Sequence, residues 1–242
     1  MIKIIYIIIL SYFVLGAAGF YFINRKKKKQ EAQKNRTKFI SYFFIIHLLF
    51  FSIVFYTPAF RYLAVLIILA GYFELFRLFR KENFGKKEFF ILAVLVFTLF
   101  AFGFYLFSGI QKEHILFSFL ILSIFDSFSQ ISGQLWGKTK ILPEISPNKT
   151  VGGVVGGALT AIFSAYLLKE LMPATLSEIF LITSGIVLFA FLGDISASYY
   201  KRRYNAKDFS NLIPGHGGFL DRFDSLIFGG AWVALYELTL KI

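Results

Sequence analysis

The sequence contains no cysteine, which excludes disulfide bonds, thiol nucleophiles and zinc sites built on cysteine. Charged residues are also scarce: they make up 17% of the 242 residues, against roughly 25% in a soluble domain. Hydrophobic residues make up 57%, and the mean hydropathy is +0.68. These values predict an all-α, polytopic integral membrane protein.

Aspartate is rare and unevenly distributed. All five aspartates lie after residue 125. An ionisable side chain among apolar spans is costly, and it usually marks a functional site or path. We therefore place the chemistry in residues 113–242 and treat residues 1–112 as a transmembrane scaffold.

Eight apolar runs predict about eight transmembrane helices, since most approach the ~20 residues that cross a bilayer. They are residues 1–23, 39–57, 61–76, 89–107, 115–136, 151–168, 177–198 and 224–240.

The basic residues predict the orientation of these spans. Of the 26 Lys and Arg, 21 lie in segments 24–38, 77–88, 137–150 and 199–223. The positive-inside rule places these segments in the cytoplasm and both termini outside. The net charge of +12 is thus mainly a topology signal, which disfavours nucleic acid as a partner.

The first four runs carry few features that indicate chemistry. We expect run 1–23 to be a retained span, because a dense basic stretch follows it and no Ala-x-Ala cleavage site does. The basic segment 24–38 is expected to be a solvated loop at the lipid surface. Glu74 and Arg77 stand three residues apart, a spacing that favours a local ion pair.

Run 115–136 is different, because Asp126, Gln130 and Gly133 share one helical face. A carboxylate there must pair with a cation, lose its charge or line a polar cavity. We favour the cavity over hydrogen bonding between helices.

Run 151–168 opens with two overlapping Gly-x-x-x-Gly spacings, which predict close helix packing and involve glycines 152, 153, 156 and 157.

Two cytoplasmic segments offer groups that could hold phosphate. Segment 137–150 contains three lysines, and Lys149 has a hydroxyl beside it. Further on, Asp194, Ser198 and Lys201 are spaced so that a helix presents a carboxylate, a hydroxyl and an ammonium on one face.

A glycine-rich turn, residues 214–218, lets the backbone pass close to phosphates. Asp221 and Asp224 follow it on one helical face. Together with Asp194 they suit Mg²⁺, which prefers hard oxygen ligands and often shares substrate phosphates. The alternative for each aspartate is a salt bridge to a nearby arginine. The set favours phosphoryl or nucleotidyl transfer at a membrane cavity, without a P-loop.

These residues resemble the phosphatidate cytidylyltransferase (CDP-diacylglycerol synthase) family. Its signature comprises Ser-x-x-Lys-Arg, Lys-Asp, Pro-Gly-His-Gly-Gly and Asp-Arg-x-Asp. The matching positions are Ser198, Lys201-Arg202, Lys207-Asp208, Pro214 to Gly218, Asp221-Arg222 and Asp224. Upstream, Asp126, Gly137-Lys138 and Ser146 to Thr150 extend the similarity, which covers about residues 120–230.

The resemblance implies transfer of CMP from CTP to phosphatidic acid, or a related anionic lipid, with release of pyrophosphate. The site would face the cytoplasm in a multi-pass protein of the inner membrane. The cofactor would be Mg²⁺, and a second, monovalent cation such as K⁺ fits the same pattern. Asp194, Lys201 and Asp221 would be catalytic, and Asp194, Asp221 and Asp224 would hold metal. The substrate-binding positions would be Asp126, Lys149, Ser198, Arg202, Lys207, His216, Gly217 and Gly218.

Two departures indicate a divergent branch with a shifted acceptor or nucleotide. Val151 and Gly152 stand where the family has an aromatic residue and Glu, and Ser129 and Gln130 where it has Ala-Tyr. The alternatives are a CTP-dependent polyprenol or phytol kinase, another phospholipid acceptor, a non-catalytic lipid-binding protein, or a transporter. A homodimer is left open.

Overall fold

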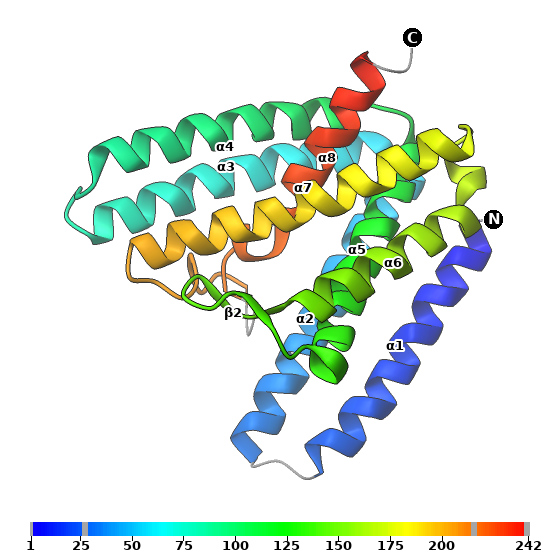
Figure 1. The fold of residues 1–242 in the computed structure, drawn as a ribbon, viewed down its shortest axis with the longest axis horizontal. Coiled ribbons are helices and arrows are strands. Elements are labelled where there is room, and N and C mark those ends of the chain that lie inside the picture. Colours follow the sequence, from blue (N-terminus) through cyan, green and yellow to red (C-terminus); the bar gives the residue numbers. More distant parts are fainter. Residues whose placement is uncertain (1, 26–28, 214–216, 240–242) are drawn as a thin grey trace.

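The computed structural model describes residues 2–25, 29–213 and 217–239. Within them the chain forms eight α-helices, one short 3-10 helix and two short strands (Figure 1). The α-helices are α1 (Ile2–Asn24), α2 (Lys29–Phe55), α3 (Thr57–Lys81), α4 (Lys87–Phe107), α5 (Lys112–Trp136), α6 (Val151–Leu167), α7 (Leu176–Arg203) and α8 (Leu220–Thr239). The other elements are β1 (Lys140–Leu142), β2 (Ser146–Thr150) and η1 (Lys169–Leu171).

The predicted all-α membrane class is confirmed, and each apolar run lies almost entirely within one helix. Four helices, α3, α4, α5 and α7, are long and apolar enough to cross a membrane by length and composition. Crossing by the other four helices and the outward-facing termini stay predictions.

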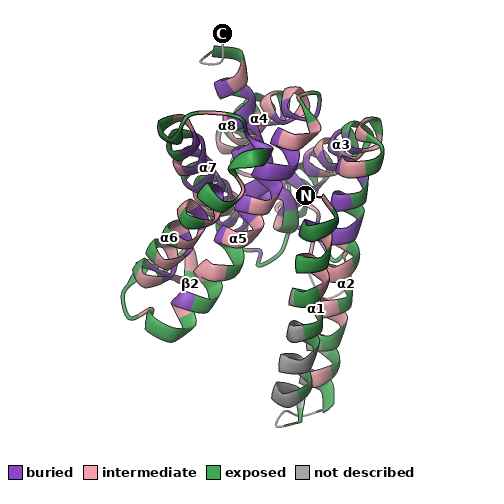
Figure 2. Ribbon diagram, turned by 90° about the vertical axis from the view of Figure 1, so that its right-hand side faces the viewer, coloured by how far each residue is buried: buried purple, intermediate pink, exposed green. Residues whose placement is uncertain are grey.

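The basic segment between the first two runs is mostly helical, so the predicted loop is wrong for residues 29–38. Helix α2 begins at Lys29, ten residues before the apolar run. Lys, Gln, Glu and Arg are good helix formers, and adding residues to an existing helix costs little compared with starting one. Figure 2 shows α1 and the adjoining part of α2 projecting away from the other helices.

Three of the four segments predicted to be cytoplasmic meet at one end of the molecule. Lys86, in the α3–α4 turn, donates from Nζ to the Arg203 carbonyl oxygen at the end of α7 (2.5 Å). Arg202 Nε in turn donates to the carbonyl oxygen of Ile145, between the two strands (3.2 Å). These contacts place the basic turns on the same side, as the charge pattern requires.

Helix α8 lies at the centre of the bundle, and most of its residues are buried. It packs against α3, α4, α5 and α7. On the α4 side the rings of Phe100 and Phe228 stack with centroids 3.8 Å apart, and on the α7 side Phe189 stacks on Trp232 at 5.4 Å. The start of this helix, which carries Asp221 and Asp224, is therefore held in position by its neighbours.

The glycines of α6 bring it into close contact with α5, which confirms the predicted packing. A Cβ atom at Gly153 would lie 2.7 Å from the Ser129 carbonyl oxygen, and one at Gly157 would lie 2.8 Å from the Phe125 carbonyl oxygen. Only glycine allows this approach. This packing places the start of α6 and the adjoining strand β2 in contact with the C-terminal half of α5, which carries Asp126 and Gln130.

Residues 140–150 form an antiparallel hairpin that the sequence did not predict. Lys140 pairs with Thr150, and Leu142 with Ser146. The Thr150 hydroxyl then accepts a hydrogen bond from the Gly153 N–H (3.1 Å), which caps α6. The hairpin fixes the position of Lys149.

Candidate functional site

The first part of the site joins α7 to the hairpin. Asp194 Oδ2 forms an ion pair with Lys149 Nζ, and Asp194 Oδ1 accepts a hydrogen bond from the Ser198 hydroxyl at 3.4 Å. The ammonium of Lys149 also lies 5.1 Å from the ring centroid of Phe191. This bond confirms the predicted common face for Asp194 and Ser198; Lys201, the third residue of that face, contacts Asp221. The Lys149 and Asp194 side chains are 22% and 31% exposed, so a ligand can reach both.

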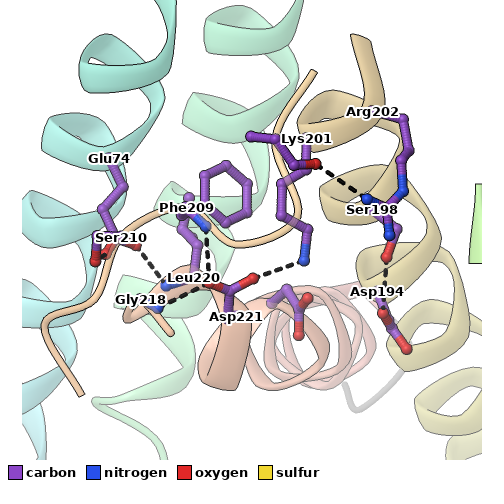
Figure 3. Close-up of polar contacts among 12 residues, drawn as sticks. Glu74, Asp194, Ser198, Lys201, Arg202, Phe209, Ser210, Gly218, Leu220 and Asp221 are labelled. Carbon is purple, nitrogen blue, oxygen red and sulfur yellow. Dashed lines mark hydrogen bonds and ion pairs between the residues drawn. The ribbon is translucent and has the colours of Figure 1, made fainter. Parts of the chain in front are cut away.

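The second part joins α7 to α8 (Figure 3). Lys201 Nζ lies 2.6 Å from Asp221 Oδ1, and the Asp221 side chain is only 2% exposed. Asp221 Oδ2 accepts hydrogen bonds from the backbone N–H groups of Phe209 and Gly218, both at 2.8 Å. The Asp221 carboxylate thus accepts from one ammonium and two backbone N–H groups. Asp221 thus ties the loop after α7 to the first turn of α8.

Two further carboxylates, Asp224 and Asp126, complete the acidic region. Asp224 is buried one turn beyond Asp221 and interacts electrostatically with Asp194 and Lys201. Asp126, exposed on α5, interacts electrostatically with Lys149 and Asp194. Carboxylates from α5, α7 and α8 therefore share one region with two lysines, and the polar cavity at Asp126 stays a prediction.

The glycine-rich turn is described from Gly217 onward. Gly217 has φ of +86°, a conformation that residues with a side chain rarely adopt. A Cβ atom there would also lie 2.7 Å from Asp221 Oδ2. Gly218 donates its N–H to the same oxygen. The prediction for His216 falls on residues 214–216, which lie outside the described residues.

Arg202 contacts backbone oxygens of the hairpin and of the loop after α7. Arg202 donates from Nε to the Ile145 carbonyl oxygen and from Nη1 to the Ala206 carbonyl oxygen at 3.1 Å. These bonds hold the hairpin against the end of α7. Lys207 is exposed. Their substrate-binding roles stay predictions.

Two of the three carboxylates predicted to hold metal contact lysines in this structure: Asp194 contacts Lys149, and Asp221 contacts Lys201. Among the described residues, no group of three or more His, Asp or Glu side chains has the arrangement of a metal site. The chemistry of the donor set nevertheless suits Mg²⁺, because every donor is a hard carboxylate oxygen. Mg²⁺ commonly takes one or two carboxylates and completes its shell with phosphate oxygens and water, so substrate would supply the remaining ligands.

Sequence reasoning missed Glu74, and the predicted ion pair with Arg77 is wrong. Glu74 is completely buried and accepts hydrogen bonds from Ser210 and from the backbone of Phe219 and Leu220. Arg77 is exposed. The spacing rule considers neighbours on one helix, whereas these donors lie more than 130 residues away. A lone glutamate within an apolar run was the signal that could have found it.

Comparison with known proteins shows the family of this chain. A family model described as the cytidylyltransferase family matches residues 1–240, well beyond the stretch 120–230 that carries the sequence resemblance. A phosphatidate cytidylyltransferase of Staphylococcus epidermidis is 40% identical over 131 residues, covering 52% of this chain and 50% of that protein. One from Bacillus subtilis is 42% identical over 117 residues (48% and 44%), and one from Rickettsia bellii is 40% identical over 129 residues (50% and 55%).

The chain spans about half the length of the curated relatives it matches. The family model, by contrast, covers nearly the whole of it, including the helices that precede the acidic region. The chain therefore belongs to the cytidylyltransferase family.

Proposed function

We propose that this protein is a phosphatidate cytidylyltransferase, which transfers CMP from CTP to phosphatidic acid and releases pyrophosphate. The observation that supports this most directly is the pair of lysine–carboxylate contacts, Lys149–Asp194 and Lys201–Asp221, contributed by three separate elements. Each lysine can exchange its carboxylate for a phosphate oxygen, since both are anionic acceptors. The relatives named phosphatidate cytidylyltransferase support the same reaction.

The proposed chemistry requires little more than positioning and positive charge. A phosphate oxygen of phosphatidic acid attacks the α-phosphorus of CTP, and a new P–O bond forms. The bond from the α-phosphorus to the bridging oxygen breaks, and pyrophosphate leaves with that electron pair. The attacking oxygen is already anionic, so no general base is needed. Lys149 and Lys201 would stabilise the charge that develops on the phosphates.

Mg²⁺ belongs to this proposal as the cofactor, with Asp194, Asp221 and Asp224 as its carboxylate ligands. When bound, it would supply additional positive charge to the phosphates. A monovalent cation such as K⁺ is proposed as a second ion. Asp126 would line the same polar region from α5.

The acceptor and the type of transfer are tested with position-labelled CTP. Purified protein is incubated with Mg²⁺, phosphatidic acid or a polyprenol, and CTP labelled at the α- or the γ-phosphate. Label from the α-phosphate should enter the lipid only with phosphatidic acid or a related phospholipid. Label from the γ-phosphate in a polyprenol would refute the proposal and identify a lipid kinase. An Asp194→Asn variant serves as the inactive control.

We also propose that the site faces the cytoplasm in the cell membrane, as the basic segments predict. The chain has no cysteine, so single cysteines can be introduced without background labelling. Cysteines replacing Lys86 and Lys207 should react with a membrane-impermeant maleimide only after intact cells are opened. Reaction in intact cells would reverse the proposed orientation.

A further inference from the structure

Glu74 reaches from α3 into the turn that starts α8, far from its own sequence neighbours (Figure 3). Glu74 Oε1 accepts hydrogen bonds from the Ser210 hydroxyl at 2.5 Å and from the Phe219 N–H at 3.0 Å. Glu74 Oε2 accepts from the Leu220 N–H at 2.8 Å. A fully buried carboxylate without donors would be strongly destabilising, so these bonds account for its presence in an apolar helix.

Two of the three donors, the Phe219 and Leu220 N–H groups, lie where a helix has unsatisfied backbone groups. Helix α8 begins at Leu220, and the N–H groups of its first turn have no partner within the helix. Asp221 accepts from Gly218, and Glu74 accepts from the next two residues in the chain. Both carboxylates also lie at the positive end of the helix dipole. Together they fix the path of the chain from residue 218 to residue 221.

Glu74 also explains why position 218 is glycine. A Cβ atom on Gly218 would lie 2.7 Å from Glu74 Cδ. The left-handed backbone conformation belongs to Gly217, not to Gly218. The restriction at position 218 therefore comes from the side chain of Glu74 rather than from backbone strain.

The same part of α3 holds the end of α7. The Tyr200 hydroxyl donates a hydrogen bond to the carbonyl oxygen of Leu75 at 2.7 Å, next to Glu74 in sequence. Tyr200 precedes Lys201, the partner of Asp221. Adjacent residues of α3 thus contact both helices that carry the acidic site.

We propose that Glu74 is a positioning residue of the active site, acting on Asp221 and Asp224 through the N-terminal turn of α8. Its hydrogen bonds go to Ser210, Phe219 and Leu220, and its effect is on the direction of the helix that carries the two aspartates. Its role in turnover rests on the proposed function, whereas its role in holding the turn does not.

The first test measures backbone hydrogen exchange of the purified protein in detergent. Glu74→Gln replaces one acceptor oxygen with an NH₂ group that faces backbone donors. Exchange in peptides covering residues 217–221 should become about tenfold to a hundredfold faster, the effect of losing a hydrogen bond to a charged group. Peptides from α5 and α6 should exchange as in the wild type. The matched control is Glu88→Gln, because Glu88 is an exposed glutamate in the first turn of α4. This variant should leave exchange at residues 217–221 and in α5 and α6 as in the wild type.

The second test uses the contact between Glu74 and Gly218. Gly218→Ala should lower kcat, because its new Cβ atom collides with the carboxyl group. In the Glu74→Ala background that space is free, so the double variant should lose no more activity than Glu74→Ala alone. KM for CTP should stay near the wild-type value in Glu74→Gln while kcat falls, because Glu74 acts on position rather than on binding.

Additive losses in the double variant, or wild-type exchange and kcat in Glu74→Gln, would overturn the proposal. If Glu74 variants do not accumulate in the membrane, Ser210→Ala removes one donor and should give a smaller acceleration at 217–221. Unchanged exchange in that variant would equally overturn it. If the wild-type protein forms no CDP-lipid, the proposed function fails, and the exchange measurements still decide the role of Glu74.

Discussion

The buried pair Lys201–Asp221 allows stability and catalysis to be separated by substitution. The two side chains are 11% and 2% exposed, and their charged atoms are 2.6 Å apart. Lys201→Met keeps the length of the side chain but removes the charge. It leaves Asp221 buried with its two backbone donors, so we expect a loss of about 3 kcal/mol in the free energy of unfolding, the low end for breaking a buried pair.

The double variant Lys201→Met, Asp221→Asn should recover most of that stability. Both backbone donors bond to the same oxygen of Asp221, so an asparagine oxygen at that position can accept both. The amide NH₂ group then faces methionine, and position 221 no longer carries a buried charge. In both variants kcat should be about 10²–10³-fold lower than in the wild type, because each lacks the Lys201 ammonium that stabilises developing charge.

Unfolding can be followed in mixed micelles by tryptophan fluorescence, because Trp232 lies on α8 and stacks on Phe189. Activity is followed by transfer of label from the α-phosphate of CTP to lipid. A double variant that is no more stable than Lys201→Met would refute the argument from the buried charge. Near-normal turnover in Lys201→Met would remove Lys201 from the catalytic residues.

Three other changes test the remaining parts of the site and its scaffold. Asp194→Asn should abolish turnover while the protein still inserts, and wild-type rate at low Mg²⁺ concentration would contradict a metal-binding role. Gly217→Ala should destabilise the turn by about 1–3 kcal/mol, because the φ of +86° is unfavourable for alanine; an unchanged melting temperature would show that the turn can rearrange. Gly157→Leu should separate α6 from α5 near Ser129 and lower the melting temperature, whereas Leu159→Ala on the exposed face of α6 should have little effect.

The sequence by itself determined the helices and one face of the site. Long apolar runs marked the eight helices because burial in lipid depends on local composition, and the spacing of Asp194 and Ser198 placed them together because helix geometry is local. The glycine pattern at 153–157 likewise predicted the close contact of α6 with α5.

Only the tertiary structure decided which cation each carboxylate contacts. Lys149 reaches Asp194 through a hairpin that no hydrophobic periodicity indicated, and Lys201 rather than an arginine meets Asp221. Glu74 is the sharpest case, because its partners depend on how α3 packs against the start of α8. Such pairings are set by how separate helices pack against one another, so no local pattern around residue 74 could specify them.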